Sequence, residues 1–281
     1  MSLRAADTVH VHGHEVHASR LRWWREILYI GAFYALYTWT RNQFGSASVD
    51  SVVAYHHALI IIDIERALGL FHEESIQGFF LGWRVFIQFW NVFYGTFHFA
   101  VTIGVLIWLF AKWRGQYAAW RNTLAFTTGL ALLGFSLFPL MPPRLLCHCE
   151  YGPNSTGSAL FTDDYGFVDT LEAYGGLWSF NEGTMAKVSN QYAAMPSLHF
   201  AWSTWCLLAI WNRTKHRWAK ILAVLYPTAT LFAIVVTANH FWLDAVGGAI
   251  VLGVGWYLGS SLANWNDRRL GAQLERVSID T

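Results

Sequence analysis

Six long apolar segments constrain this chain more than any other feature of its sequence. A helix that crosses a lipid bilayer needs about 20 mostly apolar residues, because its backbone groups can hydrogen-bond only within the protein there. The pattern therefore predicts an all-α fold, an integral membrane bundle of six transmembrane helices. The segments cover residues 26–39 (continuing toward Asn42), 85–111, 122–140, 196–211, 219–237 and 240–262.

The composition supports the same class of protein. Only 13% of the 281 residues are charged, whereas a soluble domain carries about 25%. Aromatic residues make up 17% of the chain, and such amphipathic rings collect at membrane interfaces. The net charge of +1 provides no basic surface for a polyanion. We therefore exclude a soluble enzyme, a disordered chain and a nucleic-acid-binding protein.

Residues 50–80, between the first two apolar segments, do not fit a seventh span. Val52, Ile60 and Ile64 could form one apolar side of a helix. An extra helix lying along the membrane interface is the better interpretation. Five charged residues argue against burial of this segment in lipid: Asp63, Glu65, Arg66, Glu73 and Glu74.

The positions of Lys and Arg orient the predicted bundle, because cytoplasmic segments of membrane proteins are enriched in both. With the N-terminus in the cytoplasm, fourteen of the 19 basic residues fall in cytoplasmic segments. The loop 141–195 then faces the extracytoplasmic side. The chain divides into a His-containing cytoplasmic tail (1–22), a six-span membrane domain (23–262) and a cytoplasmic tail (263–281).

Two groups of metal-ligand residues are incomplete as sites. Cys147-His148-Cys149 offers two thiolates and one imidazole, which do not complete a tetrahedral zinc site. Residues 10–17 hold four histidines in a polar stretch, where a solvated tail fits better than a metal-binding tract. We therefore expect no metal and no other cofactor.

Small residues give the sixth span a face for close helix packing. Gly255 and Gly259 are four residues apart, and Gly247, Gly248 and Gly253 precede them. Without a side chain, glycine lets the backbones of two membrane helices approach closely. We expect a neighbouring helix to pack on this face.

Ionisable residues within membrane spans are costly, so each is a candidate for function. His240 and Asp244 are four residues apart at the start of the sixth span and share one helix face. A carboxylate that accepts one ring N–H leaves the other nitrogen a better base or nucleophile. A buried polar pair that only satisfies itself is the alternative interpretation. His98 lies in the second span and could either bind a headgroup or serve as a core residue.

His199 begins the fourth span, directly after Pro196 and Ser197. The free N–H groups of a helix start favour an anion, and a histidine there can protonate a leaving oxygen. Arg144 leaves the third span at the same predicted depth, although it could equally be an interface cation without a ligand. Together with His240 and Asp244, these residues predict a phosphate-handling site at the outer interface.

The sequence Pro196-Ser197-Leu198-His199, followed by His240-Phe-Trp-Leu-Asp244, resembles the second and third signatures of the type 2 phosphatidic acid phosphatase superfamily. The branch it most resembles contains inositol phosphorylceramide synthase and sphingomyelin synthase, in which Leu replaces the Gly of Pro-Ser-Gly-His. The resemblance covers roughly residues 85–262 and includes the six-span layout. Either motif alone is weak, but the two together are specific.

The resemblance implies a metal-independent lipid phosphotransferase or phosphatase. His240 would form a phosphohistidine, with Asp244 orienting and charging it. His199 would protonate the leaving alcohol and then activate the acceptor, and Arg144 would clamp phosphate oxygens. Four further residues are candidates for substrate binding: Ser197, His98, Lys187 and Tyr192.

Two phosphate-binding cations of the phosphatase pattern are missing. The Lys expected seven residues before Arg144 is Leu137, and the Ser-Arg expected ahead of the nucleophile is Ala233-Ile234. A phosphodiester carries one negative charge and a monoester up to two, so a site with fewer cations suits a diester better. Lys187, Arg84 or His98 could supply the missing charge.

The favoured function is headgroup transfer from a phosphodiester lipid to a lipid alcohol at the outer leaflet. The expected partners are a phospholipid substrate, a lipid or water acceptor and the bilayer, with the oligomeric state open. Hydrolysis of a lipid phosphomonoester, of the phosphatidate or polyprenyl phosphate type, is the enzymatic alternative. A protein without enzymatic activity, such as a transporter or scaffold that kept the fold, is a further alternative, since intramembrane His and Asp also occur in proton relays.

Overall fold

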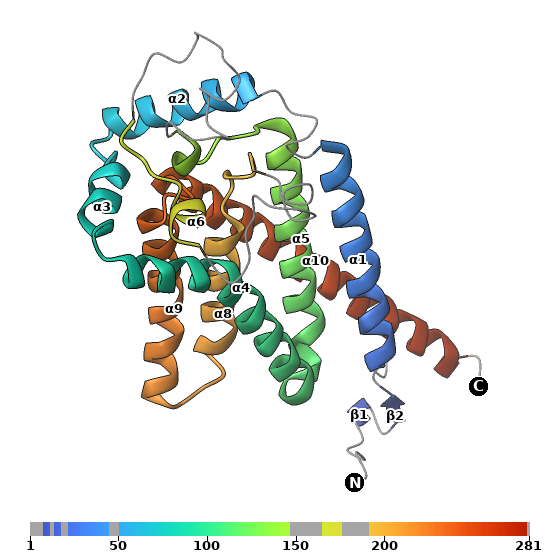
Figure 1. The fold of residues 1–281 in the computed structure, drawn as a ribbon. Coiled ribbons are helices and arrows are strands. Elements are labelled where there is room, and N and C mark those ends of the chain that lie inside the picture. The colour runs from blue at the N-terminus through green and yellow to red at the C-terminus, as the bar shows by residue number, and fades with distance from the viewer. Residues whose placement is uncertain are drawn as a thin grey trace.

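Helices form nearly all of the regular structure of this protein, for which we use a computed structural model (Figure 1). The structure describes residues 8–11, 14–17, 22–44, 51–146, 165–175 and 191–279. The strands among the described elements are β1 (Thr8–Val11) and β2 (His14–His17), which pair antiparallel. The predicted N-terminal tail thus contains a short hairpin.

Each of the six predicted apolar segments forms a helix. Four of the six helices match their predicted bounds to within a few residues. α5 begins at Arg114, ahead of the predicted start at residue 122, and α10 continues as helix through residues that were predicted as a tail from 263 onward. The six helices are α1 (Trp23–Phe44), α4 (Arg84–Lys112), α5 (Arg114–Leu137), α8 (Leu198–Trp211), α9 (Arg217–Val236) and α10 (Trp242–Ile279).

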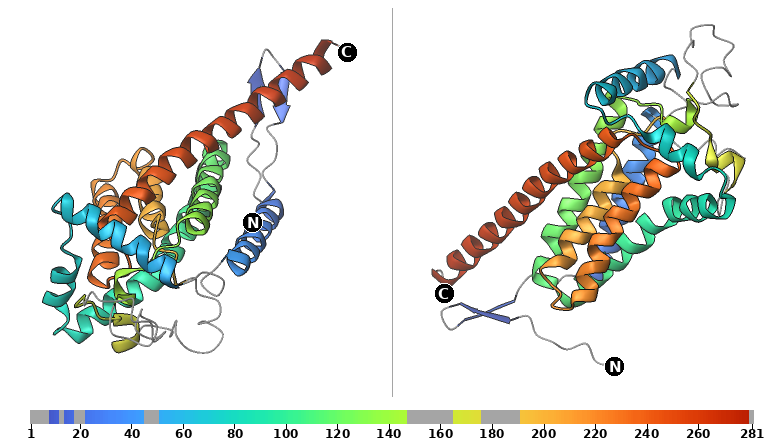
Figure 2. Two further views of the ribbon diagram at one scale, coloured as in Figure 1. Left: turned by 90° about the horizontal axis from the view of Figure 1, so that it is seen from above. Right: turned by 90° about the vertical axis from the view of Figure 1, so that its left-hand side faces the viewer.

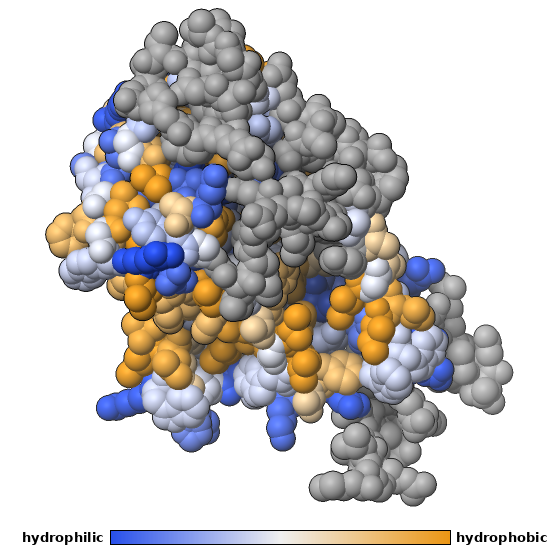
Figure 3. Space-filling model, in the orientation of Figure 1, coloured by the Kyte–Doolittle hydropathy of each residue, from blue (hydrophilic) through white to orange (hydrophobic). Residues whose placement is uncertain are grey.

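Three of these helices are long and apolar enough to cross a membrane, among the residues described: α4, α9 and the part of α10 from Trp242 to Asn266. α8 is apolar but shorter. Apolar side chains gather in a band across the lower part of one face, with hydrophilic side chains below it (Figure 3). These features support a membrane protein, whereas crossing by all six helices stays a prediction.

Several of the buried residues of α5 are threonines. The hydroxyl groups of Thr123, Thr127 and Thr128 each donate to the carbonyl four residues earlier, at 2.8–2.9 Å. Helix α5 therefore satisfies these polar groups with its own backbone, and they need no water.

The predicted interfacial helix over residues 50–80 is two helices, α2 (Ser51–Ala67) and α3 (Glu73–Phe80). α2 lies across one end of the bundle (Figures 1 and 2). Glu65 of α2 and Glu73 of α3, whose charge argued against burial of this segment in lipid, are both fully buried within the protein. They are buried because each accepts a hydrogen bond from the start of α10.

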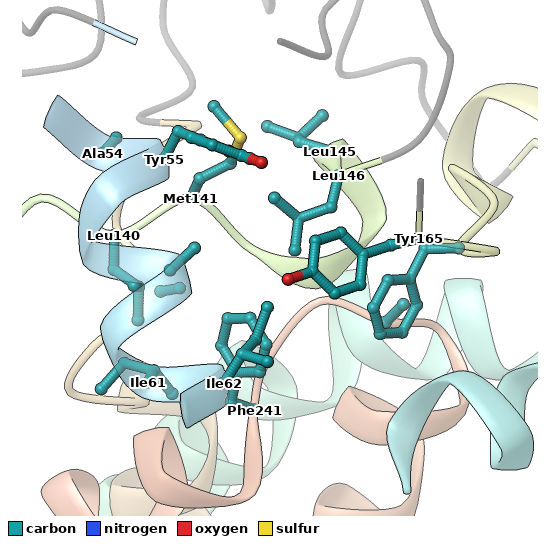
Figure 4. Close-up of a cluster of buried hydrophobic side chains, with 14 residues drawn as sticks. Ala54, Tyr55, Ile61, Ile62, Leu140, Met141, Leu145, Leu146, Tyr165 and Phe241 are labelled. Atoms are coloured by element: carbon teal, nitrogen blue, oxygen red, sulfur yellow. The ribbon is translucent and has the colours of Figure 1, made fainter. Parts of the chain in front are cut away.

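A hydrophobic cluster joins α2 to this end of the bundle (Figure 4). Ile61 and Ile62 of α2 meet Leu140, Met141 and other residues beyond the end of α5, and Phe241 at the start of α10. The short 3₁₀ helix η1 (Pro143–Leu145) and helix α6 (Thr170–Ala173) lie in the chain between α5 and α8. The residues around His240 are thus enclosed by protein.

The predicted small-residue face of α10 is confirmed at four of its five glycines. A Cβ atom on Gly255 would lie 2.3 Å from Thr127 Oγ1 of α5, and one on Gly259 would lie 2.5 Å from the Thr123 nitrogen. Gly247 and Gly248 closely approach the segment before α8. Gly253 is the exception, because nothing lies within 4 Å of its Cβ position.

Candidate active site

His240 and Asp244 form the buried pair that their spacing predicts. His240 Nδ1 lies 3.2 Å from Asp244 Oδ2, which also accepts the backbone N–H of Phe241 at 2.9 Å. The exposed fractions of His240 and Asp244 are 3% and 0%. The other ring nitrogen, Nε2, is buried and makes no hydrogen bond to described residues. A carboxylate at Nδ1 keeps the proton there and leaves the lone pair on Nε2.

Carboxyl groups from two other helices hold the start of α10 in place. The backbone N–H of Trp242 donates to Glu73 Oε1 at 3.1 Å, and that of Leu243 donates to Glu65 Oε1 at 2.8 Å. The first N–H groups of a helix have no partner within the helix, so these two carboxyl oxygens satisfy donors that would otherwise lack an acceptor. Glu65 and Glu73 therefore fix the turn that follows His240.

The carboxyl of Glu65 is protonated at neutral pH. Its pKa is raised from 4.5 to about 9, mainly because burial disfavours the charged form. A hydrogen bond to Glu73 and the negative charge of Glu73 raise the pKa further, while the N–H of Leu243 lowers it. Glu65 thus presents a neutral carboxyl, beside Glu73, to the first turn of α10.

His199 approaches His240 because the starts of α8 and α10 are bonded together. The Ser197 N–H donates to the Asp244 carbonyl at 2.8 Å, and Ser197 Oγ caps α8 by accepting from the Phe200 N–H. A Cβ on Gly248 would lie 2.4 Å from the Ser197 carbonyl oxygen, so only glycine permits this approach. The ring centroids of His199 and His240 are 5.6 Å apart.

Two residues of α4 complete the aromatic surroundings of His199. Tyr94 stacks on the His199 ring at a centroid distance of 4.1 Å, and His98 packs edge-on at 4.2 Å. His98 Nδ1 donates to the Tyr94 carbonyl at 2.9 Å, which leaves its lone pair on Nε2. The three predicted histidines therefore lie side by side in one site.

Arg144 reaches the same region through the turn that precedes His240. Its backbone N–H donates to the Ala238 carbonyl at 2.7 Å, and Ala238 has a left-handed conformation with φ of 52°. The Arg144 side chain is 5% exposed. Its Nη1 donates to Asp169 Oδ2 and its Nη2 to Gln191 Oε1, both at 2.5 Å, while Nε is buried with no described partner.

The remaining predicted residues fall elsewhere. Lys187 and the Cys147-His148-Cys149 motif lie outside the described residues. Tyr192 packs against the hydrophobic cluster under α2, and its carbonyl accepts the Leu140 N–H. Arg84 is exposed at the first residue of α4, about three turns before Tyr94. Among the described residues, no three His, Cys, Asp or Glu side chains are grouped to hold a metal ion.

Five residues of this site escaped the sequence analysis: Glu65, Glu73, Tyr94, Asp169 and Gln191. Of these, only Tyr94 carries a sequence signal, because it lies four residues before His98 and shares its helix face. The carboxyl groups act on backbone N–H groups far along the chain. No local sequence pattern could reveal such contacts.

Comparison with known proteins decides the family. A model of the PAP2 superfamily matches residues 59–258, which is more than half of the chain. The chain belongs to the PAP2 superfamily. Membership in PAP2 supports a lipid enzyme of the phosphatase or phosphotransferase type, and the apolar helices support its place in a membrane. Searches of the curated proteins and of the solved structures find no match to the chain.

Proposed function

We propose that this PAP2 chain transfers a phosphate-containing headgroup from a phosphodiester lipid to a lipid alcohol, through a phosphohistidine on His240. The observation that carries the proposal is the geometry of His240. Its Nδ1 is held by Asp244, its Nε2 has no described partner, and the His199 ring lies 5.6 Å away. One nitrogen is thus available to attack phosphorus, beside a group that can carry a proton.

In the first step, the lone pair of His240 Nε2 attacks phosphorus and the bond from phosphorus to the leaving lipid alcohol breaks. His199 donates its proton to the leaving oxygen. Asp244 stabilises the positive charge that develops on the His240 ring. Arg144 binds phosphate oxygens. The products of this step are His240 carrying the phosphate with its headgroup still attached, and a free lipid alcohol.

In the second step, the hydroxyl of the acceptor attacks the phosphorus on His240. His199 takes the hydroxyl proton, and the phosphorus–nitrogen bond breaks to restore His240. No metal takes part in either step. If water replaces the lipid alcohol, the site hydrolyses the diester and releases the phosphorylated headgroup; with a monoester donor, the same two steps would release inorganic phosphate.

The charges around Arg144 favour a diester. Arg144 already donates to Asp169, and Asp244 adds a second buried carboxylate to the site. A phosphomonoester with two negative charges would meet little net positive charge here. A diester, which has one negative charge, needs less compensation. This charge balance supports headgroup transfer over monoester hydrolysis, as in the synthase branch that the sequence resembles.

The proposal includes the arrangement of the chain in the membrane. We infer six spans, both termini in the cytoplasm and the His240 site at the extracytoplasmic side. The excess of Lys and Arg in the predicted cytoplasmic segments supports this orientation. The donor and the acceptor would then be lipids of the outer leaflet.

The test uses vesicles of phosphatidylcholine, phosphatidylethanolamine and phosphatidylinositol, each labelled at phosphorus, with ceramide or diacylglycerol as acceptor. The wild-type protein should acquire acid-labile label, and His240→Ala should acquire none. His199→Ala should slow labelling about 10²–10⁴-fold, because it removes the proton donor. His216→Ala, an exposed histidine at the other end of α8, is the matched control.

The released product identifies the acceptor. Label in a new lipid supports transfer, whereas label in the free phosphorylated headgroup shows that water is the acceptor. Efficient release of phosphate from phosphatidate, while the diesters stay intact, would overturn the proposal that the substrate is a diester. Equal activity in His240→Ala and wild type would overturn the whole mechanism.

A further inference from the structure

A second polar site lies at the opposite end of the bundle from His240. It is a cavity of about 810 Å³ between α1, α5, α10 and the end of α8. The 14 residues of α8 separate the two ends by about 20 Å, at 1.5 Å per residue. The cavity is therefore distinct from the active site, and the proposed reaction does not use it.

The cavity is strongly basic. Five arginines line it, against one acidic residue among the described lining residues. That residue, Glu26, is already paired, because both of its oxygens accept from Arg121 Nη1 at 2.6 and 2.7 Å. Four arginines therefore face the cavity without a carboxylate partner among the described residues. They are Arg22, Arg25, Arg213 and Arg269.

Arg213 is the most firmly held of the four. Its Nη1 donates to the Ala209 carbonyl at 2.8 Å and its Nη2 donates to Gln116. The guanidinium also lies over the rings of Trp120 and Trp113, at 4.7 and 5.8 Å from their centroids. Its Nε is buried and has no described partner. Each Nη group also has a second N–H with no described partner, so the fixed guanidinium still has donors for a ligand.

The surroundings point to a lipid rather than to a soluble anion. Tyr29 and Trp256 add further aromatic rings to the lining, and such rings collect where membrane helices meet the headgroup layer. Guanidinium groups bind phosphate oxygens with paired hydrogen bonds. Basic pockets between membrane helices are typical binding sites for anionic lipid headgroups.

We propose that this cavity binds the phosphate headgroup of an anionic phospholipid from the leaflet opposite to the active site. Arg213 provides the fixed donor, and Arg22, Arg25 and Arg269 provide positive charge around it. The aromatic residues accommodate the upper part of the acyl chains. The bound lipid occupies the cavity between α1 and the rest of the bundle and stabilises the folded protein, because a ligand of the native state adds to its stability.

The test is native mass spectrometry and thermal unfolding of the full chain in neutral detergent, with phosphatidylglycerol added. Phosphatidylcholine is the neutral comparison. The wild type should retain phosphatidylglycerol and unfold at a higher temperature with it. The double variant Arg25→Gln, Arg269→Gln should bind about thirtyfold more weakly, from about 1 kcal/mol per removed charge. Both side chains are exposed, so the variant should fold.

Two matched arms make the result specific. Arg114→Gln with Arg217→Gln removes the same charge from exposed arginines at this end that do not line the cavity, and it should bind phosphatidylglycerol like wild type. Arg213→Gln, which removes the fixed donor, should also bind phosphatidylglycerol more weakly than wild type. Equal losses in both double variants would mean general attraction to the surface and would overturn the site. If glycerol 3-phosphate stabilised the protein as much as phosphatidylglycerol does, the ligand would be a soluble anion and the proposal of a lipid site would be overturned.

Discussion

Replacing Asp244 should slow the reaction of His240 without unfolding the protein. Asp244→Asn keeps the size of the side chain and an oxygen for the hydrogen bond, but removes the charge that stabilises the His240 ring. We expect labelling of His240 to slow by about 10²–10⁴-fold, with little change in thermal stability. Rapid-quench measurement of the labelled protein tests this effect.

Asp63→Asn serves as the control for the loss of one carboxylate, because Asp63 is an exposed residue of α2. It should label like wild type. Normal labelling in Asp244→Asn would show that the buried pair has only a structural role.

The raised pKa of Glu65 predicts how stability depends on pH. The folded pKa of Glu65, about 9, lies above its ordinary value of 4.5. Between these values the folded state holds a proton that the unfolded chain releases, so stability is full near pH 4.5 and falls as the pH rises through 9. We expect the unfolding temperature to fall over this range, and Glu65→Gln to flatten the slope.

Thermal unfolding in one detergent at a series of pH values measures this slope. Asp63→Asn, two residues earlier on α2, should keep the wild-type slope. An unchanged slope in Glu65→Gln would place the proton elsewhere.

Helices α5 and α10 approach so closely that their contact should be sensitive to the addition of a single methyl group. A Cβ on Gly259 would meet the backbone of Thr123 at 2.5 and 2.7 Å, and backbone cannot rotate away as a side chain can. We expect Gly259→Ala to destabilise the protein by about 1–3 kcal/mol. Chemical unfolding in detergent measures the change.

Gly253→Ala on the same helix is the matched control, because its Cβ would meet nothing within 4 Å. It should be neutral or stabilise by up to about 1 kcal/mol, since alanine favours a helix more than glycine does. Equal destabilisation by both variants would contradict the close contact.

The helices could be predicted because they follow from residues close together in the sequence. The residues that support the catalytic side chains could not be predicted in this way. Apolar runs and the motif residues His199, His240 and Asp244 can be read within a few positions of one another. The burial of Glu65 depends on the start of α10, almost two hundred residues away. The sequence could therefore argue only against burial of Glu65 in lipid, and not show that a backbone donor of α10 lies beside it.

The contacts of Arg144 within the protein could not be predicted from the sequence either. The sequence places an arginine after a proline-rich turn, but its partners Asp169 and Gln191 come from the loop before α8. Loop contacts follow from the packing of the whole site rather than from periodicity. The charge balance that favours a diester could therefore be inferred only in part from missing cations.

The orientation of the whole molecule can be tested by labelling with a membrane-impermeant maleimide. In a chain whose native cysteines are replaced, Glu172→Cys in α6 should react from outside intact cells. His216→Cys, between α8 and α9, should react only after permeabilisation. Both positions are exposed and lie at opposite ends of the helices. The reverse pattern would place the active site in the cytoplasm.

The oblique course of α10 past the other helices (Figure 2) relates the chemistry to bilayer thickness. Its apolar part has 25 residues and is about 37 Å long, whereas the hydrocarbon layer is about 30 Å thick. The excess length is accommodated by tilting, and a thinner bilayer demands more tilt. Because His240 directly precedes this helix, we expect the depth of the nucleophile, and hence its access to a headgroup, to change with the acyl-chain length of the surrounding lipid.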